Sequence, residues 1–278
     1  MNYAIKYEVS LIAIVISVLL LLLSSNVSAN SCLKFSKHLE NYLSSMKKNL
    51  YMPQGDVKDL ESAYLIQKCL FNNSLSRIVG FKAGLMNKQT QSQFNVKEPV
   101  LGILLEQHIN PPASIKLDQS KILLFEIELA LKLKRDIESF DDIDLPIGQL
   151  FSSVAPAIEV ANIKFNELKT VNVNDIVASN VGAQYIYIGE FISLDTISLK
   201  NLNVTVGHSS SSLENNYQIP NSYSDQIKWL LKKSYLEGYD LYKGMILLPG
   251  SITQPIILKV GVYRVKYKGL GEQSLLVQ

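Results

Sequence analysis

The chain has 278 residues, 47% of them hydrophobic and 19% charged, which is the composition of a globular protein and not of a disordered one. Its formal net charge is +2, and no run of lysine and arginine is long enough to follow a phosphate backbone. These properties exclude a dedicated nucleic-acid-binding protein. They allow one large domain with a small helical lobe.

Residues 1–29 have the pattern of a secretory signal peptide. The apolar run Leu11–Leu23 carries no charge, Lys6 precedes it, and Val27-Ser28-Ala29 offers small residues to a signal peptidase. The run is shorter than the roughly 20 residues that span a bilayer. We therefore expect cleavage after Ala29 and export to the periplasm or medium, with no membrane contact afterwards. An uncleaved N-terminal anchor is the alternative, and lipid attachment at Cys32 is a more remote one.

Both cysteines, Cys32 and Cys69, lie in the expected mature chain. An oxidising compartment permits a disulfide between them. Two unpaired thiols fit the sequence equally well.

Two helices are predicted first, over residues 31–50 and 59–71, with a turn at Pro53-Gln54-Gly55 between them. Short apolar stretches separated by Pro, Gly and Asn then predict strands. These stretches are Ile78–Leu85, Leu101–Leu105, Ile122–Leu133, Val154–Val160, Tyr185–Ile188, Val204–Val206, Met245–Leu248, Ile256–Val260 and Val262–Tyr267. A late helix is predicted over Tyr223–Glu237, with Gly238 as its stop. The sequence thus predicts a helical lobe at 30–76 and a strand-rich domain at 77–278.

The segment Phe125–Lys134 alternates between apolar and polar residues, as a strand does. Glu126 and Glu128 therefore lie side by side on one face, and their charges repel unless a cation, a proton or a lysine intervenes. From this strand alone, a solvated outer face is the simpler interpretation and a cation site is the other.

Glu159 lies inside the apolar, strand-like run Val154–Ala161. A buried carboxylate is costly unless it is paired or coordinates a metal. Carboxylate oxygens without thiol or imidazole suit Mg²⁺ or Mn²⁺. One cation held by Glu126, Glu128 and Glu159 would remove both electrostatic problems, although spacing alone does not show that they converge.

Lys82 stands in the glycine-flanked stretch Gly80–Gly84. Its stem could reach out to water. Alternatively, the lysine holds a substrate carboxylate, or transfers protons if burial lowers its pKa. His38, His108 and His208 show no metal-ligand spacing, and we expect surface or loop positions for all three.

Six segments in order resemble the 2-keto-4-pentenoate hydratase and 4-oxalocrotonate decarboxylase branch of the fumarylacetoacetate hydrolase superfamily, and the resemblance covers roughly residues 33–278. The segments are Gly80-Phe81-Lys82-Ala83-Gly84-Leu85, Glu98-Pro99-Val100-Leu101-Gly102, Glu126-Ile127-Glu128, Ala155-Pro156-Ala157-Ile158-Glu159, Asp175-Ile176-Val177-Ala178-Ser179-Asn180 and Gly244-Met245-Ile246-Leu247-Leu248-Pro249-Gly250-Ser251-Ile252-Thr253.

The resemblance implies an α+β fold, a mixed β-roll with an N-terminal helical lobe. It implies a divalent cation held by Glu126, Glu128 and Glu159, and a small 2-keto acid that chelates it. Lys82 matches the family's catalytic lysine. Asn180, Ser251 and Thr253 match its substrate-binding positions. The expected activity is that of a metal-dependent lyase, a hydratase or decarboxylase. A monomer and a homo-oligomer are both open.

The chain departs from the family pattern around the substrate. Ser179 stands where the family has Asp, Val181-Gly182 where it has Ala-Ser, and Gln218-Ile219-Pro220 near the place of a Gly-His-Pro segment. We therefore expect binding of 2-keto acids but weak turnover of 2-hydroxypenta-2,4-dienoate. The alternatives are a C–C hydrolase of the fumarylacetoacetate type and an exported binding protein that keeps the fold without catalysis.

Overall fold

The computed structural model describes residues 32–48, 51–72, 76–117, 122–163, 165–166, 168–200, 202–212 and 214–278. The predicted signal peptide, residues 1–29, lies outside these residues. Within the described part of the chain, no helix has the length and apolar character needed to cross a membrane.

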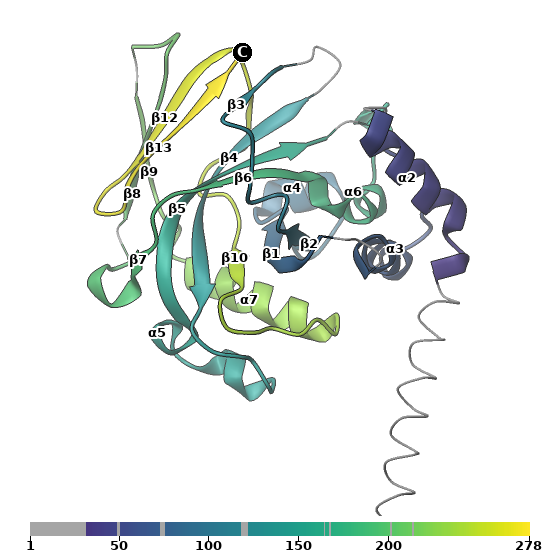
Figure 1. Cartoon of the computed structure of the whole chain (residues 1–278), viewed down its shortest axis with the longest axis horizontal. Coiled ribbons are helices and arrows are strands. Elements are labelled where there is room, and N and C mark those ends of the chain that lie inside the picture. The colour runs from purple at the N-terminus through teal and green to yellow at the C-terminus, as the bar shows by residue number, and fades with distance from the viewer. Residues whose placement is uncertain are drawn as a thin grey trace, which may run out of the picture.

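Helices gather at one side of the molecule (Figure 1). They are α2 (Ser36–Lys48) and α3 (Leu60–Asn72) from the predicted lobe, and α6 (Val173–Ala178) from much later in the chain. α6 begins at a capping box in which Asn172 and Asp175 bond each other's backbone N–H groups. α3 packs against α6. The division into a helical lobe at 30–76 and a domain at 77–278 stays a prediction. α3 of the predicted lobe contacts α2 of the same lobe and also α6 of the predicted domain.

Hydrogen bonds and a disulfide fix the helical side to the rest of the protein. The buried Gln67 amide on α3 donates to Leu101 O (2.9 Å) and Val177 O (3.2 Å). Cys32 and Cys69 form a disulfide, which decides between the two states that the sequence left open. Because the disulfide occupies the Cys32 sulfur, it leaves no thiol there for lipid attachment.

A large mixed sheet forms the body of the protein, in the order β2-β1-β10-β4-β5-β6, with β11 beside β4 and β7 beside β5. Its strands are β1 (Ile78–Gly84), β2 (Val100–Leu105), β4 (Leu123–Leu133), β5 (Phe151–Asn162), β6 (Ala183–Ile188), β7 (Ile192–Ser193), β10 (Ile246–Leu248) and β11 (Ile256–Ile257). β1 and β10 are parallel, and the other pairs are antiparallel.

A second sheet has the order β3-β13-β12-β8-β9 and curls over the first (Figure 1). Its strands are β3 (Ser114–Ile115), β8 (Asn203–His208), β9 (Asn215–Gln218), β12 (Gly261–Tyr267) and β13 (Gly271–Val277). The Tyr263 ring stacks on Phe125 with centroids 4.6 Å apart, and the Tyr267 hydroxyl donates to Ala157 O at 2.6 Å. The two sheets therefore share one core, and the predicted α+β mixed β-roll is confirmed.

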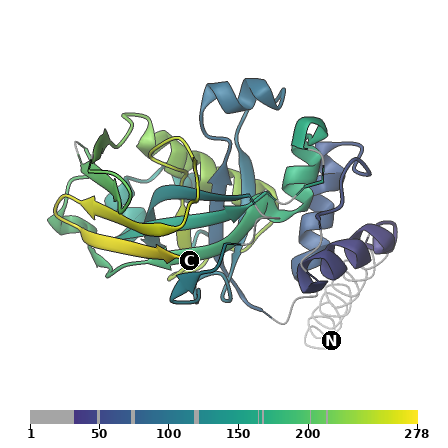
Figure 2. The same ribbon diagram turned by 90° about the horizontal axis from the view of Figure 1, so that it is seen from above.

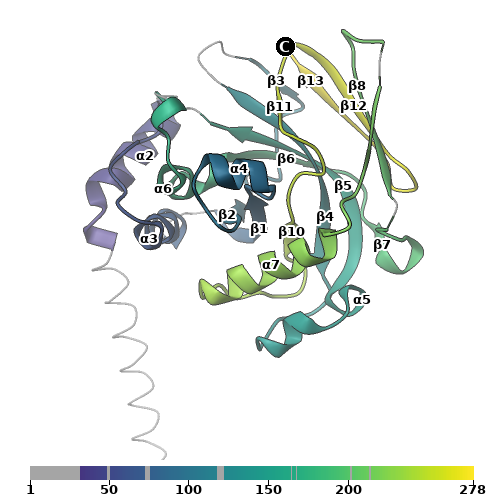
Figure 3. The ribbon, with the colours of Figure 1, turned by 180° about the vertical axis from the view of Figure 1, so that it is seen from behind.

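The remaining helices lie around the sheets (Figures 2 and 3). They are α4 (Lys88–Gln93), α5 (Ile147–Leu150), α7 (Tyr223–Leu236) and the 3-10 turns Asp141–Asp144, Leu168–Thr170, Asn180–Gly182 and Leu194–Thr196. α7 matches the predicted late helix, and Gly238 follows it with φ +74°. α4 projects from the body in Figure 2 and, in the view of Figure 3, lies between α6 and α7.

Both faces of β4 are buried between Ile127 and Leu131. Phe125 and Ile127 belong to the main core. The opposite face, with Ala130, packs in a smaller cluster against residues of β1, β2, β5, β6 and β10. The solvated outer face that this strand alone favoured is therefore wrong, and the glutamates on it point into the protein.

Candidate active site

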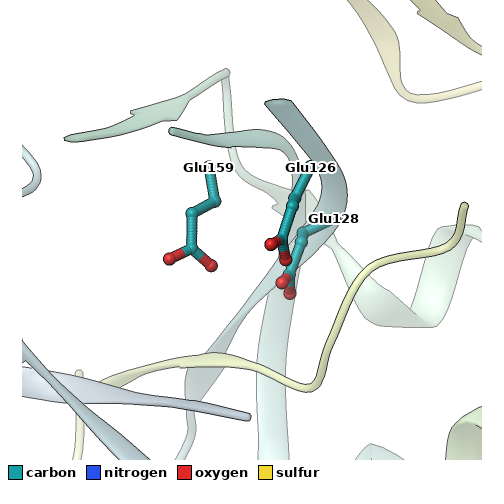
Figure 4. A group of neighbouring side chains, drawn as sticks. All are labelled: Glu126, Glu128 and Glu159. Atoms are coloured by element: carbon teal, nitrogen blue, oxygen red, sulfur yellow. The ribbon is translucent and has the colours of Figure 1, made fainter. Parts of the chain in front are cut away.

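Three glutamates converge on the face of β4 and β5 that also carries the smaller apolar cluster. The β4–β5 register places Glu126 directly opposite Glu159, and Glu128 follows two residues later on the same face of β4. One carboxylate oxygen from each lies within 4.8 Å of the others (Figure 4). Glu128 and Glu159 are fully buried, and Glu126 is half-buried.

Burial and mutual repulsion disfavour the charged forms of these groups. Burial, and then the charge of Glu159, raise the pKa of Glu126 to about 7. Burial raises the pKa of Glu128 well above its ordinary value, and both neighbouring glutamates add to this. The pKa of Glu159 is also raised by burial, although Lys82 opposes the shift.

The site has an unmet need for positive charge. Glu128 Oε1 and Glu159 Oε2 are buried without a hydrogen-bond donor among the described residues. Lys82 supplies one positive charge against three carboxylates. All donors are carboxylate oxygens, without sulfur or imidazole, and such sets suit hard divalent cations. The residues therefore fit a divalent cation.

Lys82 on β1 is only 1% exposed, so its stem does not extend to water as the simplest interpretation of the sequence expected. It forms an ion pair with Glu159 and donates to Val181 O at 3.2 Å. Gly102 on β2 makes room for it, since a Cβ there would lie 2.7 Å from Lys82 Cγ. Burial alone would lower the pKa of Lys82, but the three glutamates raise it. Lys82 is therefore a fixed positive charge.

A cavity of about 720 Å³ opens above Lys82 and Glu126. Its walls include α4 with the loop that precedes it, the segment from Tyr217 to Gln226, and the loop from Ser251 to Pro255. Asn87 Nδ2 and Gln254 Oε1, 3.4 Å apart, join two of these walls. The size is that of a small-molecule site.

The predicted residues Ser251 and Thr253 both line this cavity. Ser251 Oγ accepts from Ile127 N at 3.3 Å, and Gly250 N donates to Glu128 Oε2 at 3.0 Å. The loop thus fixes β4 and one of the glutamates. Gly250 has φ +122°, a backbone conformation that residues other than glycine rarely adopt.

Asn180 is placed differently from the prediction. Its buried amide accepts from Ile103 N (2.7 Å) and donates to Ile103 O (2.9 Å), and it does not line the cavity. These two hydrogen bonds give the Asn180 amide a structural role, and its predicted contact with substrate stays a prediction. A φ of +60° suits an asparagine at this turn.

The residues that depart from the family pattern lie partly in the helical layer and partly in the cavity walls. The Ser179 hydroxyl donates to Asp175 O at 2.8 Å, inside the helical layer. Val181, at φ +54°, and Pro220 line the cavity. Two of the departing segments therefore contribute apolar groups to the cavity walls.

Sequence reasoning missed several residues at or near the site. α4 is a run of polar residues without apolar periodicity, so no signal marked it as a cavity wall. His38 and His108 are buried, contrary to the expected surface or loop positions, although His108 does lie in a turn. His108 Nδ1 accepts from Leu105 N at 3.1 Å, and burial, with a smaller effect of Lys82, lowers its pKa to about 4.

A comparison with protein-family models finds none that matches the chain. The 2-oxo-hept-4-ene-1,7-dioate hydratase of Escherichia coli is 23% identical over 228 residues, which cover 77% of this chain and 85% of that enzyme. The 4-oxalocrotonate decarboxylase of Pseudomonas putida is 24% identical over 208 residues, which cover 72% of this chain and 77% of that enzyme.

Among solved structures, the 4-oxalocrotonate decarboxylase from Pseudomonas putida G7, complexed with magnesium and adipate, superposes with a TM-score of 0.74. It is 19% identical, and the match covers 87% of this chain and 96% of that one. The chain therefore has an α+β fold of the fumarylacetoacetate hydrolase type and is similar in sequence to a hydratase and a decarboxylase, which confirms the resemblance carried by the six segments.

Proposed function

We propose that the protein is a metal-dependent lyase that hydrates or decarboxylates a small 2-keto acid or its dienol. The observation that carries this proposal is a group of three glutamates beside a charged lysine at the floor of a cavity. Two of the glutamates are fully buried, and each has one oxygen without a hydrogen-bond donor among the described residues. The similar hydratase and decarboxylase support the reaction class. Mg²⁺ is the first candidate metal, and Mn²⁺ suits the same donors.

The roles follow from the placement of the side chains. Glu126, Glu128 and Glu159 would hold the cation, which supplies Lewis acidity toward the negative charge that develops on a 2-keto acid. Lys82 keeps its positive charge and faces the cavity, so it would attract the substrate carboxylate. Ser251 and Thr253 would orient the substrate from the opposite loop.

Calorimetry with oxalate beside an absorbance assay of dienol loss tests this proposal. In the presence of Mg²⁺, wild type should bind oxalate, and Lys82→Met should bind it about tenfold or more weakly because a buried charge pair is lost. Lys134→Met, an exposed change just after the end of β4, is the control and should bind as wild type does. Release of two fragments from an acylpyruvate would favour the hydrolase, and tight binding without any turnover would favour the binding protein.

We also propose that the protein is exported after cleavage at Ala29. The Cys32–Cys69 disulfide supports this, because disulfides persist in oxidising compartments and are rare in the cytosol.

A further inference from the structure

We infer that the cavity selects 2-keto acids whose far end is uncharged and largely apolar, and that it discriminates against 2-keto dicarboxylates. This inference rests on the proposed function and narrows its substrate class. It separates the chain from two of its relatives, whose substrates, 2-oxo-hept-4-ene-1,7-dioate and 4-oxalocrotonate, carry two carboxylates by name.

The charges of the cavity are confined to its floor. Among the described residues that line it, only Lys82 and Glu126 carry charge, and both belong to the group that would receive the keto-acid head. Lys82 is already paired with Glu159. Within the same described lining, the walls beyond the floor contain no arginine, lysine or histidine that could pair with a second carboxylate.

The walls above the floor are mainly apolar. Their larger apolar side chains are Met86, Phe94, Leu124, Ile163, Tyr217 and Ile252. The polar groups among them are hydroxyls and amides, which carry no charge. A carboxylate moved from water to such walls loses hydration without gaining a counter-charge, and that transfer is unfavourable.

Gln226 on α7 gives a second, independent reason why a ligand with a carboxylate at its far end should bind weakly. It lines the cavity, and its Oε1 is buried without a hydrogen-bond partner among the described residues. An acceptor oxygen cannot pair with a carboxylate, which only accepts hydrogen bonds at neutral pH. It can pair with a hydroxyl on a neutral tail.

Three ligands of matched head group test the inference by calorimetry on the Mg²⁺-loaded protein. Pyruvate reports the head-group site alone, 2-oxohexanoate adds an apolar tail, and 2-oxoadipate has the same carbon number with a carboxylate at the far end. We expect 2-oxohexanoate to bind more tightly than pyruvate, and 2-oxoadipate about tenfold or more weakly than 2-oxohexanoate.

Two variants of Gln226 sharpen the test. Gln226→Arg supplies the missing cation and should raise the affinity for 2-oxoadipate relative to 2-oxohexanoate about tenfold, whereas Gln226→Leu should leave the preference for 2-oxohexanoate in place. Wild type that binds pyruvate but prefers 2-oxoadipate, or binds both six-carbon acids equally, overturns this inference and leaves the proposed function standing. Absence of pyruvate binding in the presence of Mg²⁺ overturns the proposed function, and the inference falls with it.

Discussion

Glu128→Gln should stabilise the metal-free protein while removing its response to metal. Glu128 is fully buried, its Oε2 accepts from Gly250 N, and its Oε1 has no donor among the described residues. Glutamine keeps the shape and an acceptor for Gly250 but carries no charge next to Glu126 and Glu159. Replacing buried charges by neutral groups is often stabilising, and we expect roughly 1–3 kcal/mol at pH 8.

The sign of the pH dependence follows from the raised pKa of Glu128. A carboxyl group whose folded pKa lies above its ordinary value of 4.5 contributes stability below that value, and the contribution is lost as the pH rises through the folded pKa. The advantage of Glu128→Gln should therefore nearly vanish at pH 5 and grow toward pH 8. At about 2–4 °C per kcal/mol, it should raise Tm at pH 8 by about 2–12 °C.

Mg²⁺ should reverse the order of stability, so that wild type becomes more stable than Glu128→Gln. At a Mg²⁺ concentration 100 times Kd, wild type gains about 2.7 kcal/mol, whereas a variant without one of the ligands gains far less. The assay is thermal unfolding at pH 5 and pH 8 with EDTA or Mg²⁺, with the exposed change Glu272→Gln as control. A Glu128→Gln protein that is less stable than wild type without metal at pH 8, or that keeps the full Mg²⁺ shift, would refute the reasoning.

Three further predictions concern other parts of the chain. Asn180→Ala should lower the free energy of unfolding by about 2–4 kcal/mol in urea titrations, because Ile103 N and O both lose buried partners; Asn180→Asp, which can still accept, should lose less, and equal losses would contradict this account. Reduction of the Cys32–Cys69 disulfide, with a sequence separation of 37, should cost about 3–4 kcal/mol in the chain-entropy description, so dithiothreitol should lower Tm of wild type and leave Cys32→Ser unchanged. Intact-mass measurement of protein from its native host should give a chain that begins at Asn30, and a cytoplasmic species that retains Met1 would exclude export.

The residues of the metal group were predictable from sequence, but their convergence was not. Alternation along β4 placed Glu126 and Glu128 on one face. It could not show that this face is covered, because the covering side chains come from distant strands such as β1 and β6. The contact between Glu126 and Glu159 depends on the β4–β5 register, which the intervening segment sets without any repeating pattern.

Asn180 and α4 show where sequence patterns fail for other reasons. The six-segment resemblance marked Asn180 as a site residue but could not predict the hydrogen bonds of its amide. Their partner, Ile103 on β2, is 77 residues away in the chain. α4 has a polar sequence, and its place beside the cavity comes from tertiary structure. Long elements with clear periodicity, such as α7 and β4, were predicted within a few residues.

Glu126, Glu128 and Glu159 should hold a divalent cation at which a 2-keto acid binds. Calorimetric titration of oxalate into the protein, with Mg²⁺ and then with EDTA, tests it most directly. The account predicts binding with Mg²⁺, none with EDTA, and none for Glu159→Gln under either condition. Failure of wild type to bind oxalate in the presence of Mg²⁺ or Mn²⁺, or equal binding after the metal is removed, would contradict it.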